Sequence, residues 1–402
     1  MLHYLDHAAG TPVRASAVEA MLRMVTSEFG NPSGAHRMAR NANRALDDAR
    51  EAMADAIGVD PGEIVFTSGG TEADNLAING VIGARGGLAV CSAIEHHAVL
   101  EPVEHLGGLI APVDALGLID LDALAEILRS SVEPVSLVSV MLVNNETGVI
   151  QPLEPIRALI DELAPGALLH TDAVQALCWV DVAASTQCAD LISVSAHKFG
   201  GPKGTGVLGV RNDVKLAPMQ RGGGQEKGRR NGTQNAPGIV SMATAATEAV
   251  TTRPSELARV GALRDRLADG LIAAIPDTVE SAVPVGDDRT GFDRTGKTVN
   301  LCHLAFNGIE SEALLFLLEK HDIMASAASS CSSGAQDPSH VLAAMGVGRE
   351  LAAGSLRLSL GHNSTDADVD AALEAVPAAV ARLRDHTGYK QPQNTREESA
   401  HG

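Results

Sequence analysis

A short polar segment, Ser195-Ala196-His197-Lys198, directly follows an apolar run over residues 189–194. A lysine amine condenses with a carbonyl compound to give a Schiff base when its surroundings keep it partly neutral. Lys198 stands just past the end of a predicted buried strand, where open α/β sheets place their ligands. Ser195 and His197 are suited to donate hydrogen bonds to a phosphate. Alone, the segment would be read as a surface lysine in a flexible loop, so other strand ends decide its meaning.

A glycine turn joins an apolar run to a helical pattern earlier in the chain. The run covers residues 63–67, and Ser68-Gly69-Gly70-Thr71-Glu72 leads from it into a helix predicted from about residue 73. The first amides of a helix lack partners within the helix and carry partial positive charge, so a phosphate binds well there. The spacing is neither that of a P-loop nor that of the dinucleotide fingerprint. Alone, this turn would be a tight helix cap.

Further polar side chains follow apolar runs in the same way. His96, Asn145 and Asp172 each come after a different run. Singly, Asp172 is best read as a helix cap and His96 as a structural histidine. The carboxyl ends of parallel strands meet at one edge of a sheet, so the whole series, with Thr71 and Lys198, predicts one shared ligand site.

The composition is that of a large globular protein. The 402 residues are 45% hydrophobic and 20% charged, which suffices for a large core and for two or more domains. A formal net charge of −19 argues against direct binding to nucleic acid or to an anionic membrane. The amino terminus has no signal-peptide pattern and no later run approaches a membrane span, so we expect a cytoplasmic protein.

The cysteines show no metal-binding or redox pair. None is spaced as Cys-x-x-Cys, and we expect no metal site. Most should be buried small hydrophobic residues. The five are Cys91, Cys178, Cys188, Cys302 and Cys331.

Apolar runs alternate with helical patterns through the first half of the chain. This alternation predicts an α/β protein with a mostly parallel sheet covered by helices on both faces. We expect a large domain over residues 16–250 and a smaller α/β domain that combines residues 1–15 with 251–386. A helix over residues 256–274 would link them, and residues 387–402 would form a disordered tail.

The order of the motifs resembles that of the cysteine desulfurases, which are pyridoxal-phosphate enzymes of the class V aminotransferase superfamily. The resemblance runs from Tyr4 to about Arg384, nearly the whole chain. It implies fold type I, the aspartate-aminotransferase-like fold, with a large sheet of the seven-stranded type and a smaller α/β domain. The motifs that carry it are Ser68-Gly69-Gly70-Thr71-Glu72, Glu95-His96-His97-Ala98-Val99-Leu100, Val143-Asn144-Asn145-Glu146-Thr147-Gly148, His170-Thr171-Asp172-Ala173-Val174-Gln175 and Ser195-Ala196-His197-Lys198-Phe199-Gly200.

Three motifs in the second half support the narrower family. Arg221-Gly222-Gly223-Gly224, with Arg230-Asn231-Gly232-Thr233, is similar to the family's glycine triplet and the threonine segment after it. Ser329-Ser330-Cys331-Ser332-Ser333-Gly334 resembles its nucleophile loop. Gly354-Ser355-Leu356-Arg357-Leu358 resembles the strand that carries its substrate-binding arginine.

The resemblance assigns a role to each residue of the cofactor site. Lys198 would hold pyridoxal 5′-phosphate covalently and move a proton at the substrate Cα. Asp172 would pair with the pyridinium nitrogen, while His96 would stack on the ring and serve in proton transfer. The other cofactor contacts would come from Gly70, Thr71, Asn145, Gln175, Ser195, His197 and, toward the phosphate of the other subunit of a homodimer, Thr233.

The resemblance also names the substrate, L-cysteine. Arg357 would clamp its carboxylate with help from Asn145, since a guanidinium binds a carboxylate through two parallel hydrogen bonds. Cys331 would attack its sulfur as a thiolate, leaving L-alanine and an enzyme persulfide. The outer sulfur would pass to an acceptor or scaffold protein, for iron–sulfur cluster assembly or thiolation.

Two other function classes stay open at this point. Another class V pyridoxal-phosphate enzyme, such as an aminotransferase or a selenocysteine lyase, would make Cys331 incidental. A non-enzymatic scaffold would have no need of Lys198, Asp172 and His96 together. Fold alone does not decide among these classes.

Overall fold

The structure is a computed structural model that describes residues 1–402 except 212, 285–292, 328–338 and 390–402. Its main feature is a seven-stranded sheet with the strand order β2-β8-β7-β6-β5-β3-β4. The strands are β2 (Ile64–Thr67), β3 (Leu88–Ser92), β4 (Leu109–Ala111), β5 (Val135–Ser139), β6 (Leu168–Asp172), β7 (Leu191–Ser195) and β8 (Gly206–Val210).

The sheet is mostly parallel, as predicted. The strands β4, β3, β5, β6 and β7 pair in parallel, and only β8 runs antiparallel to its neighbours β7 and β2. The inner strands β6, β7 and β8 are short and buried at every position, as expected of strands covered on both faces, although β6 and β7 also contain polar residues. The predicted α/β fold of type I is thereby confirmed.

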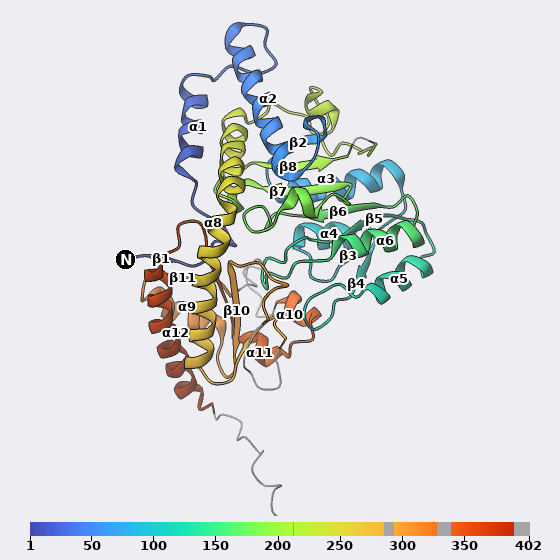
Figure 1. Cartoon of the computed structure of the whole chain (residues 1–402). Coiled ribbons are helices and arrows are strands. Elements are labelled where there is room, and N and C mark those ends of the chain that lie inside the picture. The colour runs from blue at the N-terminus through green and yellow to red at the C-terminus, as the bar shows by residue number, and fades with distance from the viewer. Residues whose placement is uncertain (212, 285–292, 328–338, 390–402) are drawn as a thin grey trace, which may run out of the picture.

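Helices pack on both faces of this sheet (Figure 1). Successive residues of β2 show the two faces, since Ile64 and Phe66 belong to one buried cluster and Val65 to another. The helices of the first part of the chain are α1 (Ala15–Thr26), α2 (Arg37–Ile57), α3 (Gly70–Arg85), α4 (His97–His105), α5 (Leu121–Ser130), α6 (Leu153–Leu163), α7 (Val182–Ser185) and α8 (Ala236–Ala274), with the 3₁₀ turns η1 (Pro61–Glu63), η2 (Ala196–Lys198) and η3 (Gln225–Gly228).

The C-terminal part builds a second core. It contains an antiparallel sheet of β9 (Thr278–Glu280), β10 (Leu301–Phe306) and β12 (Ser355–Ser359), and the short parallel pair β1 (His3–Tyr4) and β11 (Ile323–Met324). Its helices are α9 (Ser311–Glu319), α10 (His340–Ala344), α11 (Arg349–Ala353) and α12 (Asp366–Thr387). Leu5, near the amino terminus, is buried in this core beside residues of β10 and β12. The domain boundaries themselves stay a prediction.

Helix α8 begins 20 residues earlier than the predicted helix over residues 256–274. Thr251-Thr252-Arg253-Pro254 reads as a helix breaker, because proline lacks the amide that continues the ladder. The structure keeps Pro254 inside the helix. The preceding turns contain alanines, such as Ala245 and Ala246, that are fully buried in the same cluster as residues of α1 and α2, so tertiary packing outweighs the local signal. Figure 1 shows α8 extending along both parts of the molecule.

Smaller differences concern element ends. The helix expected from residue 73 begins at Gly70, within the glycine turn. The apolar run over residues 135–143 is a strand only as far as Ser139. Thr387, expected in the tail, ends α12, and Gly388 caps it in the left-handed conformation at φ 67°. The remaining tail from residue 390 lies outside the described residues.

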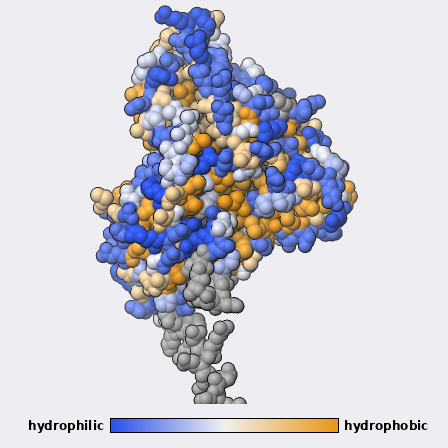
Figure 2. All heavy atoms as spheres, in the orientation of Figure 1, coloured by the Kyte–Doolittle hydropathy of each residue, from blue (hydrophilic) through white to orange (hydrophobic). Residues whose placement is uncertain are grey.

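Hydrophilic and hydrophobic residues are distributed unevenly over the face of the molecule shown in Figure 2. Hydrophilic residues cover the upper end of the molecule in Figure 2, where α2 begins, and hydrophobic ones are more frequent over the middle of that face. Among the described helices, none combines the length and the apolar composition of a membrane span.

Candidate active site

One cavity of about 290 Å³ opens at the carboxyl ends of the strands. Of the predicted site residues that the structure describes, all but Thr233 line it. These are Gly70, Thr71, His96, Asn145, Asp172, Gln175, Ser195, His197, Lys198 and Arg357. The topology explains this gathering, because β3, β5, β6 and β7 run parallel and end at the same edge.

Lys198 ends the 3₁₀ turn η2, which directly follows β7. Its Nζ donates hydrogen bonds to the backbone carbonyls of Ala8 and Ala9, the latter at 3.2 Å. The side-chain amide of Gln175 donates to the same Ala8 carbonyl at 2.9 Å. The amino-terminal segment therefore lies against the lysine amine, within the cavity.

Asp172 ends β6, and its Oδ1 accepts a hydrogen bond from the amide of Val174 at 2.8 Å. Burial raises the pKa of its carboxyl to about 6, although the Val174 amide and the charge of Lys198 oppose that shift. Burial also raises the pKa of Asp74, beside it in the cavity, well above its usual range, and the charge of Asp172 adds to this. One buried acid thus favours the protonated form of the other.

His96 caps α4, since its Nδ1 accepts a hydrogen bond from the amide of Ala98 at 3.0 Å. Burial lowers the pKa of this imidazole to about 4, helped by the charge of Lys198. The ring is therefore neutral near pH 7. Because Nδ1 is an acceptor, its proton is on Nε2.

Small residues and hydroxyls gather where β2 turns into α3. The turn leaves the amino end of a long helix facing the cavity, and Gly69 at its cap has no side-chain cap bond. A Cβ on Gly70 would lie 2.8 Å from Cγ2 of Val174, so only glycine leaves room there. The Ser195 hydroxyl lies 2.9 Å from Nδ1 of His197, at the same end of the cavity. These groups form a cradle for an anion.

Arg357 enters the cavity from β12 with its side chain only 5% exposed. Its Nη1 donates to the backbone carbonyl of Asn145 at 2.9 Å, and its Nη2 donates to Oδ1 of Asp6 at 2.9 Å. Its Nε is buried and has no hydrogen-bond partner among the described residues. A buried guanidinium with an unsatisfied donor is suited to receive a carboxylate.

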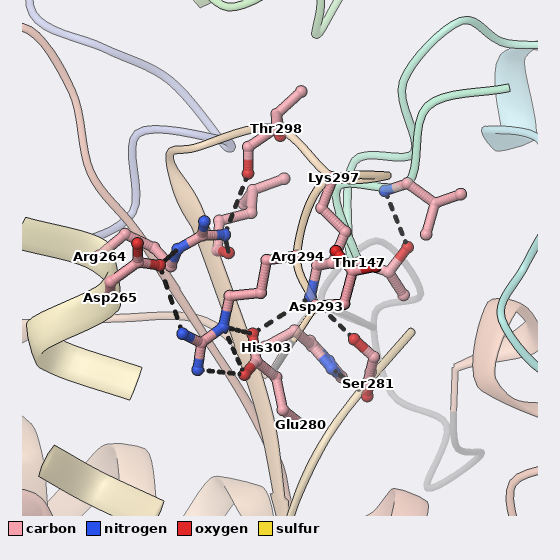
Figure 3. A network of polar contacts seen from close by, with 12 residues as sticks. Thr147, Arg264, Asp265, Glu280, Ser281, Asp293, Arg294, Lys297, Thr298 and His303 are labelled. Atoms are coloured by element: carbon pink, nitrogen blue, oxygen red, sulfur yellow. Dashed lines mark hydrogen bonds and ion pairs between the residues drawn. The ribbon is translucent and has the colours of Figure 1, made fainter. Parts of the chain in front are cut away.

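A network of buried charged side chains lies at the antiparallel sheet of the C-terminal part, at strand β9 (Figure 3). The fully buried carboxylate of Glu280, on β9, accepts hydrogen bonds from Arg294 at 2.7 to 3.0 Å and lies 3.4 Å from Nζ of Lys297. The amide of Thr298 donates to the carbonyl of Gly148 at 2.8 Å. The network therefore fixes the segment that packs against the loop after β5, which carries Asn145.

Two predicted site residues, Thr233 and Cys331, need separate comment. Thr233 is exposed outside it, and its predicted contact belongs to a second subunit. Cys331 lies outside the described residues. Ser326, five positions before it in the sequence, lines the cavity and exchanges backbone hydrogen bonds with Arg357 at 2.8 and 3.2 Å.

Two acidic residues of the cavity were given no role by the sequence. Asp6 pairs with Arg357, and Asp74 lies beside Asp172. Asp6 belongs to the turn-rich start of the chain, where aspartate is common and so does not indicate a functional role. Asp74 lies within the predicted helix, and only its place on the sheet-facing side would have marked it as buried.

Comparison with known proteins identifies the family. The family model of the class V aminotransferases matches residues 3–372. An IscS-like cysteine desulfurase from Mycobacterium tuberculosis is 44% identical over 393 residues, which cover 95% of this chain and 97% of that protein. The chain belongs to the cysteine desulfurase family. The cysteine desulfurase IscS from Methanosarcina thermophila is 43% identical, with 95% of this chain and 92% of that protein covered.

Solved structures agree with this family assignment. A NifS-like protein superposes with a TM-score of 0.85 at 33% identity, covering 95% of this chain and 100% of that chain. A structure described as SspA in complex with cysteine has a TM-score of 0.73 at 31% identity, with 89% of this chain and 98% of that chain covered.

Class V aminotransferases use pyridoxal 5′-phosphate, and the cavity of this desulfurase fits that cofactor. Lys198 offers an amine, and Asp172 has an oxygen beyond the one bound to Val174. Gly70, Ser195 and His197 form the cradle that suits a phosphate. The residues present thus match the amine, ring-nitrogen and phosphate contacts that the cofactor requires.

Proposed function

We propose that this desulfurase takes sulfur from L-cysteine, with the residues of the cavity in the following roles. The observation that carries the proposal is that a single cavity brings together Lys198, Asp172 and Arg357. These are an amine, an acid and a guanidinium, which are the groups that a cofactor-bound amino acid requires. Pyridoxal phosphate, when bound, supplies the electron sink that weakens bonds at the substrate's carbons.

Arg357 binds the substrate carboxylate. Its Nε is the buried donor without a partner, and its Nη1 is already fixed on the Asn145 carbonyl. A charged donor left unsatisfied in a buried site costs several times what a surface one does, so a carboxylate that accepts from it binds well. The side chain of Asn145 lines the same cavity and supports the carboxylate from a second direction.

Lys198 holds the cofactor and, once released, moves the proton at the substrate Cα. Asp172 holds the ring nitrogen in its protonated form, since an ionised carboxylate in a buried site gains most from a cationic partner. His96 is neutral near pH 7 and carries its proton on Nε2, so it acts first as a donor. Gln175 and the phosphate cradle orient the cofactor.

Cys331 receives the sulfur. Its thiolate attacks the sulfur of the substrate, and the carbon–sulfur bond breaks with its electron pair left on the substrate carbon. That carbon takes up a proton and becomes the methyl group of L-alanine, while Cys331 carries the persulfide. Support comes from Ser326, which lines the cavity shortly before Cys331 in the sequence.

Product analysis tests this function. Purified protein loaded with pyridoxal phosphate should release L-alanine and, with a thiol reductant, one sulfide for each alanine. An aminotransferase would instead convert a keto acid and leave the sulfur in place. A lyase specific for selenocysteine would act on that amino acid and leave L-cysteine intact. Either result would replace the desulfurase assignment.

A homodimer belongs to the same proposal. Val18, Leu22 and Val25 lie on one face of α1 and are 51 to 59% exposed, followed by Phe29 at 70%. An apolar stripe of this kind is typical of a surface that meets a partner, and a second copy of the chain is the partner proposed here. Thr233, also exposed, would then complete the phosphate contacts of the neighbouring subunit. Sedimentation of the purified protein measures its oligomeric state.

The destination of the sulfur is a protein acceptor, in iron–sulfur cluster assembly or in thiolation. A persulfide is transferred by attack of an acceptor thiolate on its outer sulfur, which suits a protein cysteine. Transfer of labelled sulfur from Cys331 to captured partner proteins identifies the acceptor. The cytoplasmic location expected from the sequence is proposed with it, and cell fractionation tests it.

A further inference from the structure

Asp6 lies in the cavity directly beside Arg357. The ion pair between its Oδ1 and Nη2 of the arginine is 2.9 Å long, with the arginine side chain 5% exposed and the aspartate side chain 21% exposed. The Asn145 carbonyl holds Nη1 at 2.9 Å. Two anchors therefore fix the guanidinium plane, while Nε has no partner among the described residues.

The backbone of Asp6 is held firmly. Its carbonyl accepts hydrogen bonds from the Tyr4 hydroxyl at 3.1 Å and from the amides of Ala9 and Gly10 at 3.1 and 3.3 Å. The Tyr4 hydroxyl also donates to the Gly10 carbonyl at 2.7 Å, so it closes the turn. Asp6 itself forms a parallel bridge with Ser359 of β12, the strand that carries Arg357. Its carboxylate is thus presented from a rigid support.

The same turn reaches the cofactor lysine. Ala8 and Ala9 offer their carbonyls to Nζ of Lys198, only two and three residues after Asp6. One short segment of chain therefore contacts both the group that holds the cofactor and the group that holds the substrate carboxylate. Its position relative to both is fixed by the bonds of Tyr4 and Ser359.

We propose that Asp6 is a positioning residue for the substrate carboxylate. It acts through Arg357, whose guanidinium it holds with the partnerless Nε in place for the incoming carboxylate. A free arginine side chain loses rotamer freedom when it binds a carboxylate, and the ion pair with Asp6 removes that cost before the substrate arrives. The inference rests on the proposed function, in which Arg357 binds that carboxylate.

Asp6 could instead oppose substrate binding by competing for Arg357. A carboxylate on Arg357 competes with a second carboxylate for the same charge and repels it. In that case, removal of Asp6 would strengthen substrate binding. The sign of the change in affinity therefore distinguishes positioning from competition.

Binding of two small amines to the pyridoxal-phosphate-loaded protein tests the inference. L-alanine carries the carboxylate and ethylamine lacks it, and both are followed through the visible absorption of the cofactor. Asp6→Ala should weaken L-alanine binding by about tenfold, as expected for the loss of a charge-assisted hydrogen bond, and leave ethylamine unchanged. Asp6→Asn should lose only about threefold, since its amide oxygen still accepts from Nη2.

Asp368→Asn is the matched control. The Asp368 carboxylate holds His3 at 2.8 Å and so fixes the same amino-terminal strand, but it does not line the cavity. This variant should bind both amines as the wild type does. If the Asp6 variants bind both amines more weakly, or bind L-alanine more tightly, the positioning role is overturned.

Arg357→Ala separates this inference from the proposed function. It should weaken L-alanine binding by more than Asp6→Ala does and leave ethylamine binding unchanged. If Arg357→Ala keeps L-alanine affinity, the proposed role of Arg357 fails and the inference fails with it. If Arg357→Ala loses affinity while Asp6→Ala does not, only the inference on Asp6 fails.

Discussion

Glu280 and Arg294 form an ion pair 2.7 Å long in which the glutamate side chain is fully buried. Lys297, whose side chain is 1% exposed, lies 3.4 Å from the same carboxylate. Glu280 thus balances two cations that water barely reaches. Since residues beside Lys297 hydrogen-bond to the loop that carries Asn145, this pairing links the stability of the smaller sheet to the geometry of the active site.

The first prediction concerns the stability of this network. Glu280→Gln should lower the free energy of unfolding by about 3–5 kcal/mol, because it removes the buried negative charge that Lys297 and Arg294 share. Urea denaturation measures the change. Asp269→Asn is the control, since Asp269 also pairs with Arg294 at 2.7 Å but is 57% exposed. That variant should change the free energy of unfolding by less than about 1 kcal/mol. Equal effects of the two substitutions would contradict the larger contribution of Glu280 to stability.

The second prediction concerns pH and the cofactor-free protein. Burial raises the pKa of Asp172 to about 6, so the folded protein binds this proton more tightly than the unfolded chain does. The stability that the protonated acid provides is therefore present below about pH 4 and is lost as the pH rises through about 6. Asp172→Asn should remove that loss and stabilise the cofactor-free protein near pH 7 by on the order of 2 kcal/mol.

Urea midpoints between pH 4 and pH 8 measure this effect. The control is Asp48→Asn on α2. Asp48 is exposed, so this variant should show the same change of urea midpoint with pH as the wild type. The same Asp172→Asn protein should bind pyridoxal phosphate more weakly, since the ring nitrogen loses its anionic partner. Identical pH profiles for Asp172→Asn and the wild type would show that Asp172 is not the buried acid that the structure describes.

The site could largely be predicted from the sequence because its residues follow apolar runs. Asp172 ends a strand, and His96, Asn145 and Lys198 lie in the segments that follow strands; a parallel sheet brings such ends together. The partners of these residues could not be predicted in the same way. Asp6 and Arg357 are 351 residues apart, and no local pattern connects them.

The fold shows the same limit. Strand ends and most helices have strong local signals, but α8 crosses Pro254 because its alanine-rich first half is buried against other helices. Such packing is decided by the tertiary structure, which local propensity does not contain. The buried position of Asp74 inside α3 depends likewise on which face of the helix meets the sheet.

The third prediction places the cofactor. Borohydride reduction of the loaded protein should fix the pyridoxyl group on Lys198, because the amine of that residue lies in the cavity. Peptide mass spectrometry locates the added mass. Lys203 is the internal comparison, since it belongs to the same loop and does not line the cavity. A label chiefly on Lys203 would reject the assignment of Lys198.

The fourth prediction tests the shared site. If Thr233 completes the phosphate contacts of the neighbouring subunit, Thr233→Ala should weaken cofactor binding by about tenfold, the value of a hydrogen bond to a charged group. Mixing Lys198→Ala chains with Thr233→Ala chains should restore activity, since each heterodimer contains one intact site. Unchanged cofactor affinity in Thr233→Ala, or no gain on mixing, would contradict the shared site.

The central claim is that Cys331 accepts sulfur from L-cysteine, and the mass of that cysteine after reaction tests it most directly. The protein is incubated with L-cysteine without reductant, and its peptides are then measured by mass spectrometry. We predict one additional sulfur on Cys331 and none on Cys91, Cys178, Cys188 or Cys302. Cys331→Ala should still bind L-cysteine but release neither alanine nor sulfide at the normal rate. A persulfide chiefly on another cysteine, or full desulfuration by Cys331→Ala, would contradict the account.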